Sequence, residues 1–326
     1  MNPTLTALPV LVLYPHRRCN CRCVMCDIWK DRSADEISPD DLERHLDDIS
    51  RLKVQWIVLS GGEPLMHSDL FRLTALIRSR GIRVTILTTG LLLEHHARSI
   101  VESVDDVIVS LDGPPPIHDQ VRRVPGAFTR IACGIAALHQ LNPEFPVSAR
   151  STVQRLNYRY VRETARLVRQ LGFRSISFLA ADMTSQAFNR TTALNVLGQA
   201  KLALDEGQIS ELSVEFSGLW SDWAGTDFLV EDRPKLHRIL QHFRAQLGVT
   251  EPVAPRCNAP WVSAVLESDG TVRPCFFQDP IGKAGESSLL EVVNGPQAVA
   301  FRSSLDVSTD SICKRCVCSL NWKECA

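Results

Sequence analysis

The residues best suited to chemistry lie near the start of the chain, where Cys19, Cys23 and Cys26 follow a CxxxCxxC spacing. An apolar run over 10–14 precedes them, so the cysteines are predicted to lie in a loop after a strand. Three thiolates from one loop can hold three corners of a cuboidal 4Fe-4S cluster and leave the fourth iron open. A structural zinc site, with Cys21 as the fourth thiolate, is the competing interpretation.

A second motif, Gly61-Gly62-Glu63-Pro64, follows the apolar run over 54–59. Two glycines let the backbone approach a ligand closely, and a carboxylate can accept hydrogen bonds from an ammonium group. Alone, this motif is equally typical of an ordinary turn. Beside the cysteine loop, it predicts a binding site for a small charged ligand.

The cysteines are strongly clustered. Eleven are present, with four in residues 19–26, six in residues 257–325, and Cys133 alone in an apolar helical pattern, where we expect a core residue. Such short spacings, in a chain predicted to be cytoplasmic, favour metal or iron-sulfur ligation over disulfides. For the second group, a zinc ion and an iron-sulfur cluster are both open interpretations.

The net charge and the apolar content of the chain give no support for some classes of binding partner. The formal charge of −1 gives no reason to expect nucleic acid or an anionic membrane. The apolar stretch over 7–14 is too short to span a bilayer and contains Pro9, so we expect neither export nor a membrane anchor.

The elements that must position these motifs can be read from hydrophobic periodicity. Strands are predicted at 10–14, 54–59, 82–87, 106–111, 147–153 and 173–179, with helices between most of them. This alternation predicts an α/β fold, a partial (β/α)6 parallel barrel. The motifs then meet at the carboxyl ends of the strands.

Three regions are predicted along the chain. Residues 1–181 form the barrel, residues 182–254 a helical linker that contributes to the substrate site, and residues 255–326 a small cysteine-rich extension. In the extension, Asp269-Gly270 lies between two β-like runs and predicts a hairpin with a tight primed turn, in which both residues have positive φ. The hairpin brings Cys257 and Cys275 towards a common site.

With these motifs in place, the chain resembles the radical SAM superfamily over about residues 8–180. The resemblance implies that Cys19, Cys23 and Cys26 ligate a 4Fe-4S cluster and that Cys21 does not. S-adenosylmethionine (SAM) would bind the open iron through its amino and carboxylate groups. By the resemblance, Gly61, Gly62 and Glu63 would hold the amino group of SAM. Thr88, Ser110 and Arg150, all near strand ends, are candidates to bind its carboxylate or ribose. Met25 would lie beside the adenine. Core packing is an equal interpretation for Met25.

The end of the chain resembles the SPASM or twitch extension of these enzymes, which holds auxiliary 4Fe-4S clusters. It departs from the full SPASM spacing, so we expect one auxiliary cluster, on Cys257, Cys275, Cys313 and Cys316. Cys318 or Cys325 can replace one of these.

The family chemistry implied is reductive cleavage of SAM to a 5′-deoxyadenosyl radical that abstracts hydrogen from the substrate. We expect a two-electron oxidation of a small molecule, assisted by the auxiliary cluster, with electrons from a reducing protein such as flavodoxin or ferredoxin. Asp182 is a candidate proton acceptor, with helix capping as its alternative role. A peptide maturase that forms thioether or carbon-carbon links, and a non-catalytic zinc-binding protein, are the alternatives.

Overall fold

A curved sheet of parallel strands forms the centre of the computed structural model, which describes residues 2–190 and 194–323. The strand order is β6-β5-β4-β3-β2-β1-β7-β8-β9, and neighbouring strands from β6 to β1 and on to β7 are parallel. The first six strands are Val10–Leu13, Trp56–Leu59, Arg83–Thr88, Asp106–Ser110, Val147–Val153 and Ser175–Ala180. Each lies within two residues of its predicted range, and β6 is an edge strand. The predicted partial (β/α)6 barrel is therefore confirmed.

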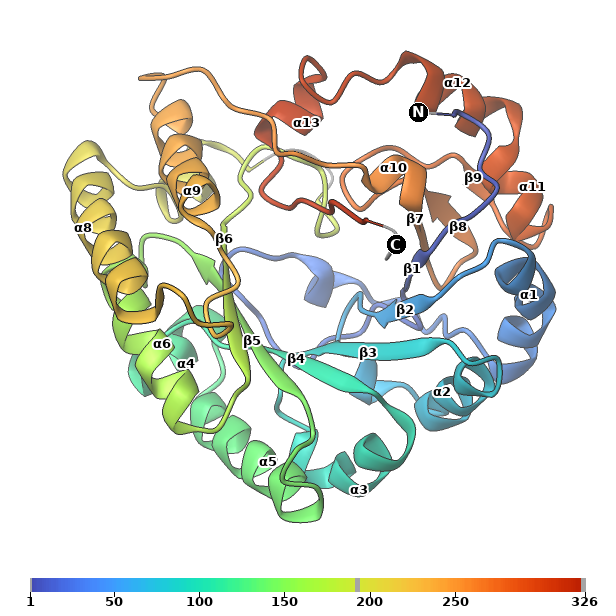
Figure 1. Ribbon diagram of the computed structural model, residues 1–326, viewed down its shortest axis with the longest axis horizontal. Coiled ribbons are helices and arrows are strands. Elements are labelled where there is room, and N and C mark those ends of the chain that lie inside the picture. Colours follow the sequence, from blue (N-terminus) through green and yellow to red (C-terminus); the bar gives the residue numbers. More distant parts are fainter. Residues whose placement is uncertain (1, 191–193, 324–326) are drawn as a thin grey trace.

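Six helices cover the convex face of this sheet (Figure 1). They are α1 (Pro39–Arg51), α2 (Leu70–Ser79), α3 (Leu93–Ser103), α4 (Pro115–Arg122), α5 (Ala127–Leu141) and α6 (Val161–Gln170). Short 3₁₀ turns η1 (Ile28–Lys30), η2 (Pro64–Met66) and η3 (Tyr158–Tyr160) lie in the connections. Helix α1 begins as predicted, because Ser38 and Asp41 form a reciprocal capping box and Pro39 occupies the first turn.

The two faces of the sheet differ in polarity. In β5 the residues alternate, with Val147, Ala149 and Val153 buried under the helices and Ser148 and Arg150 half-buried on the other face. Strand register places Ser110, Arg150 and Ser177 side by side on that concave face. The inside of the barrel is therefore lined with polar groups at its carboxyl end.

The segment after β6 contains α7 (Val196–Ala200), α8 (Glu206–Trp223) and α9 (Arg233–Gln246). Helix α8 packs against α6 and α9, and α9 packs against β6. The backbone near Leu229 also bridges to Ile176 of β6. This segment therefore extends the wall of the barrel beyond its last strand.

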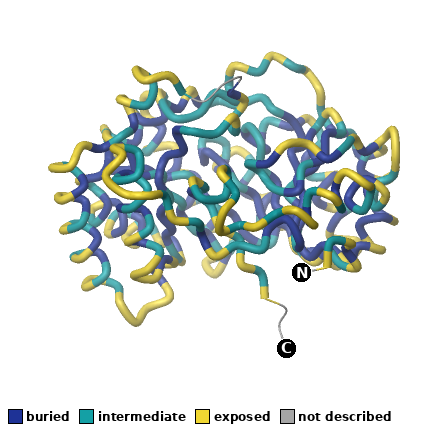
Figure 2. The backbone as a smooth tube through the Cα atoms, turned by 90° about the horizontal axis from the view of Figure 1, so that it is seen from above, coloured by how far each residue is buried: buried dark blue, intermediate teal, exposed yellow. Residues whose placement is uncertain are grey.

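The C-terminal extension continues the same sheet. It contains α10 (Ala259–Val262), β7 (Ser263–Leu266), β8 (Thr271–Arg273), β9 (Gly282–Lys283), α11 (Leu289–Asn294), α12 (Pro296–Ser304) and α13 (Ser311–Arg315). Strand β7 pairs in parallel with β1, and β8 and β9 follow in antiparallel order. One hydrophobic cluster includes Leu13 of the barrel and Val272 and Val293 of the extension. Buried positions accordingly run through the whole interior (Figure 2).

Two details differ from the sequence predictions. The β7–β8 hairpin exists, but its connection has four residues, and only Gly270 (φ +83°) has positive φ, so the primed turn is wrong. Cys133 is exposed rather than buried, because α5 buries Ile131, Ile135 and Leu138 on its opposite stripe. Among the described residues, no helix is long and apolar enough to cross a membrane.

Candidate active site

The cysteine loop crosses the carboxyl end of the sheet directly after β1. Its backbone is fixed to the end of α4, because Arg22 N donates to Arg122 O (3.1 Å) and Val24 N donates to Val121 O (3.1 Å). Cys23 is buried, whereas Cys19 and Cys26 are half-buried. Three thiols of the predicted spacing are therefore presented by one anchored loop.

Gly61 and Gly62 let the end of β2 pass closely under this loop. A Cβ on Gly62 would lie 1.9 Å from the carbonyl oxygen of Arg18, the residue immediately before Cys19. Gly61 adopts φ +96°, and a Cβ there would meet Tyr14 and the His16 carbonyl at 2.9 Å. The two glycines are thus required by close backbone approach, whatever further role they have towards a ligand.

Glu63 is fully buried, and its carboxylate is hydrogen-bonded to the segments that follow β2 and β3. One oxygen accepts hydrogen bonds from Thr88 Oγ1 (2.8 Å) and Leu65 N (3.1 Å), and the other accepts one from Thr89 N (2.6 Å). Burial raises the pKa of this carboxyl above its usual value, although these hydrogen bonds act in the opposite direction. Thr88 therefore contacts Glu63, and its contact with SAM stays a prediction.

The thiol of Cys23 contacts a buried ion pair. Arg122 Nη1 lies 3.5 Å from Cys23 Sγ, and Arg122 Nη2 lies 2.6 Å from Asp112 Oδ2. A hydrogen bond from Cys21, together with the positive charge of Arg122, lowers the pKa of Cys23 against the effect of burial. The sequence analysis did not single out Arg122, because a lone arginine on a helix has no spacing signal.

The loop after β6 covers the cysteine loop. Arg190 bonds Asp182 Oδ2 (2.6 Å) and the Met25 carbonyl (2.6 Å), and Ser185 Oγ also donates to Asp182 (2.7 Å). Asp182 precedes no helix directly, so the capping alternative is wrong. Its carboxylate is instead engaged by a buried arginine. Met25 lies beside Gln154, whose Nε2 is 3.7 Å from Met25 Sδ.

Ser110 and Arg150 lie near each other on the concave face, as register partners on β4 and β5. Arg150 Nε is 3.4 Å from Ser177 Oγ on β6, the only hydrogen bond of this guanidinium in the described residues. Arg150 is also an electrostatic neighbour of Cys318 from the extension. The concave face therefore connects the barrel with the second cysteine group.

That second group gathers at the same end of the molecule. Amide groups donate to two of its sulfurs: Ala259 N to Cys257 Sγ (3.4 Å) and Gln278 Nε2 to Cys313 Sγ (3.5 Å). Cys316 is held through α9, since Arg238 Nη1 donates to the Cys316 carbonyl (2.8 Å). Cys275 is an electrostatic neighbour of each of the other cysteines in this group: Cys257, Cys313, Cys316 and Cys318. The predicted substitute Cys325 lies outside the described residues.

A cavity of about 330 Å³ lies beside Tyr14, which is an electrostatic neighbour of Cys26 in the first cysteine group and of Cys318 in the second. Its wall includes Tyr14 and Gly61 of the barrel, Phe188 and Arg190 of the loop after β6, and Phe276 of the extension. Phe188 and Phe276 pack edge to face at 4.8 Å. The cavity is thus built from all three regions of the chain.

These residues fit iron-sulfur groups and a polar ligand. Buried polar atoms without a hydrogen-bond partner in the described part of the chain include Arg122 Nε, Arg190 Nε and Gln154 Oε1, all around the cysteine loop. Such orphaned groups are costly unless a ligand satisfies them. Among the described residues, no three His, Cys, Asp or Glu side chains lie close enough together to bind a single metal ion.

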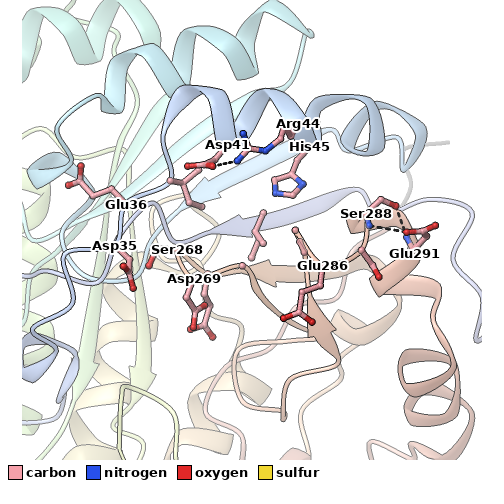
Figure 3. Close-up of a pocket in the computed structure, with 17 residues that line it drawn as sticks. Asp35, Glu36, Asp41, Arg44, His45, Ser268, Asp269, Glu286, Ser288 and Glu291 are labelled. Atoms are coloured by element: carbon pink, nitrogen blue, oxygen red, sulfur yellow. Dashed lines mark hydrogen bonds and ion pairs between the residues drawn. The ribbon is translucent and has the colours of Figure 1, made fainter.

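A wider groove of about 950 Å³ lies beside the β7–β8 turn and α1 (Figure 3). Many of its lining side chains are acidic, and several of them have partners within the fold. Asp41 and Glu291 complete the capping boxes of α1 and α11, and Glu36 pairs with Arg18. Local structure therefore accounts for part of the acidic lining.

Comparison with known proteins identifies the family to which this chain belongs. The family model of the radical SAM superfamily matches residues 13–177, and that of an iron-sulfur cluster-binding domain, SPASM, matches residues 257–317. The chain therefore belongs to the radical SAM superfamily and carries the SPASM iron-sulfur extension. These two matches favour iron-sulfur clusters and SAM over the zinc interpretation at both cysteine groups.

Relatives differ in what they act on. The chain is 33% identical to an AdoMet-dependent heme synthase of Methanosarcina barkeri over 162 residues, which cover 47% of this chain and 45% of that protein. It is 25% identical to a PqqA peptide cyclase of Ruegeria pomeroyi over 272 residues, covering 81% and 66%. The chain thus aligns over less than half of the heme synthase.

The fold is also similar to that of Streptococcus suis SuiB bound to S-adenosylmethionine. The TM-score is 0.70 at 17% identity, and the match covers 97% of this chain and 74% of SuiB. This likeness supports the shared arrangement of barrel and extension.

Proposed function

We propose that this protein is an oxidoreductase that uses SAM and two 4Fe-4S clusters to remove hydrogen from its substrate. The observation that carries the proposal is that Tyr14, in the wall of the cavity, is an electrostatic neighbour of both Cys26 of the CxxxCxxC loop and Cys318 of the second cysteine group. When bound, SAM and its cluster supply a carbon radical that abstracts hydrogen, and the auxiliary cluster supplies an acceptor for the remaining electron.

The residues that would hold these groups follow from their positions. Cys19, Cys23 and Cys26 would ligate the first cluster, and Cys257, Cys275, Cys313 and Cys316 the auxiliary one. Cys318 is a fifth thiol at the auxiliary site and competes for one of these places. The half-buried Ser110 and Arg150 are proposed to bind the SAM carboxylate or ribose, because among the described residues the guanidinium has one hydrogen-bond partner, the neutral Ser177 hydroxyl at 3.4 Å.

Met25, Gly61 and Gly62 are proposed to contact SAM through the backbone and apolar surface of their loops. Glu63, with the backbone of Gly61 and Gly62, is proposed to hold the amino group of SAM, and its carboxylate also accepts hydrogen bonds from Thr88 and Thr89. Asp182 is proposed to accept a proton from the substrate through Oδ1, because its hydrogen bonds from Ser185 and Arg190 both fall on Oδ2.

A small substrate fits the cavity best. Its volume of about 330 Å³ is near the lower end of the range of about 300–1,000 Å³ for small-molecule sites. Aromatic rings form one wall and the Arg17–Glu267–Arg273 ion-pair network another. Such a lining suits a compact substrate with an apolar part and polar substituents.

Peptide maturation is the second candidate function. It is favoured by the similarity to a peptide cyclase over most of the chain and by a fold neighbour, SuiB, solved with its precursor peptide SuiA. One side chain of a peptide would also fit a cavity of this size. In either case we propose a flavodoxin or ferredoxin as the electron donor.

The test is anaerobic reconstitution of the full chain. We expect about eight iron atoms per chain, as two 4Fe-4S clusters require, and 5′-deoxyadenosine after addition of SAM and dithionite. Cys23→Ala should abolish the nucleoside, and Cys133→Ala, an exposed cysteine on α5, should leave it unchanged. Zinc in both cysteine groups with no nucleoside product would refute the proposal and support a zinc-binding protein.

A further inference from the structure

Arg122 is the only charged side chain in the described residues that donates a hydrogen bond to a sulfur of the CxxxCxxC loop. Its guanidinium lies under the loop, with the residue 7% exposed, and it comes from the last turn of α4. Two backbone hydrogen bonds tie the same turn to the loop, from Arg22 and Val24. The contact with Cys23 is thus built into the fold.

The opposite side of Arg122 is fixed by Asp112. This carboxylate is fully buried, lies 2.6 Å from Arg122 Nη2, and accepts a hydrogen bond from Thr152 N at 2.7 Å. Since Thr152 belongs to β5, the sheet itself holds Asp112 in place. The result is a line of groups from the sheet to the loop: Thr152, Asp112, Arg122 and Cys23.

The remaining nitrogen of Arg122 has no partner. Nε is buried and makes no hydrogen bond within the described residues, and neither does Asp112 Oδ2, although this oxygen lies 2.6 Å from Nη2 in the ion pair. The buried pair therefore has unused hydrogen-bonding capacity beside Cys23, which Nη1 contacts at 3.5 Å. A sulfur of an iron-sulfur cluster held by Cys23 is an acceptor of the required kind.

Resting on the proposed function, we propose that Arg122 is a positioning residue that sets the reduction potential of the SAM-binding cluster, and that Asp112 limits its effect. The reduced form of a cluster carries one more negative charge than the oxidised form. A cation and N–H donors beside the sulfurs therefore favour reduction, and a buried carboxylate opposes it.

The proposal predicts shifts of opposite sign. Arg122→Met removes the positive charge and should lower the reduction equilibrium constant at least tenfold, which is about 59 mV more negative for one electron. Asp112→Asn keeps the acceptor for Thr152 but removes the negative charge, so it should shift the potential in the positive direction. Arg122→Lys keeps the charge but loses the forked geometry, so its shift should be the smaller.

The experiment is an EPR-monitored redox titration of the reconstituted full chain. The SAM-binding cluster is identified by the change in its signal when SAM is added. The auxiliary cluster is the internal control, and its potential should be unchanged in all three variants. As a matched variant, Arg238→Met, whose guanidinium contacts the Cys316 carbonyl, should alter only the auxiliary signal.

The outcomes separate this inference from the proposed function. A wild-type chain without a SAM-responsive 4Fe-4S signal would overturn both. The role of Arg122 alone is overturned if the SAM-responsive signal is normal but the reduction equilibrium constant changes less than twofold in the variants. It is also overturned if Arg122→Met and Asp112→Asn shift the potential in the same direction. If Arg122→Met does not fold, because Asp112 loses its partner, Arg122→Met/Asp112→Asn takes its place, and Asp112→Asn alone still tests the sign.

Discussion

Replacing Gly62 by alanine should displace the cysteine loop. The added Cβ would lie 1.9 Å from the Arg18 carbonyl oxygen, so the two segments must separate by about 1.1 Å to reach the 3.0 Å limit of real contacts. The same oxygen accepts the hydrogen bond from Glu63 N at 2.8 Å. Overpacking of this kind costs about 1–3 kcal/mol and the weakened hydrogen bond about 1 kcal/mol, so we expect a loss of about 2–4 kcal/mol.

Cys19 follows Arg18 directly, so the shift should also reduce cluster loading. We would measure the unfolding temperature of the apo chain, and the iron content and 5′-deoxyadenosine yield after reconstitution. A 1 Å misplacement can lower the rate about 100-fold. The control is Gly207→Ala in the first turn of α8, where a Cβ meets Asp205 Oδ1 at an ordinary 3.4 Å. Wild-type stability and iron content in Gly62→Ala would show that the close approach is not as described.

Three further predictions follow from buried groups. Thr88→Val removes the 2.8 Å bond to Glu63 and should destabilise the chain by about 1–3 kcal/mol in urea unfolding; an unchanged midpoint would contradict this. Cys275→Ser should lose about half of the iron, whereas Cys133→Ser should lose none. Burial raises the pKa of Glu231, so its stabilising contribution is complete below the usual value of about 4.5 and is lost as pH rises through the folded pKa. In Glu231→Gln, the unfolding temperature of the apo chain should therefore depend less on pH between the usual and the folded pKa of Glu231. An unchanged pH dependence of the unfolding temperature would contradict this prediction.

Much of the architecture follows from local patterns. The six strands are short apolar runs, and both Gly81 and Gly172 adopt the positive φ expected after the helices that precede them. The motifs meet because parallel strands bring their carboxyl ends to one edge. These features depend on neighbours in sequence or on a regular topology, which is why periodicity is sufficient to predict them.

The contacts that organise the site do not follow from such patterns. Arg122 and Cys23 are 99 residues apart, and Arg190 and Met25 are 165 residues apart. No spacing rule links a helix arginine to a distant thiol, so these pairs appear only when the chain is folded. The exposed Cys133 shows a related limit, since a helix with small residues on every side gives a weak indication of its buried face.

The pairing of β7 with β1 has a consequence for synthesis of the chain. Val10 has Ser263 as its partner, 253 residues later, so one side of the first strand must wait for the extension to be translated. At about 5–20 residues per second, that interval lasts on the order of 10–50 seconds. Throughout it, an apolar strand leaves the ribosome with bare backbone amides along one edge, the kind of surface on which nascent chains associate with one another. Expression slowed late in the message, or truncated before Ser263, should therefore yield aggregates rather than an isolated barrel.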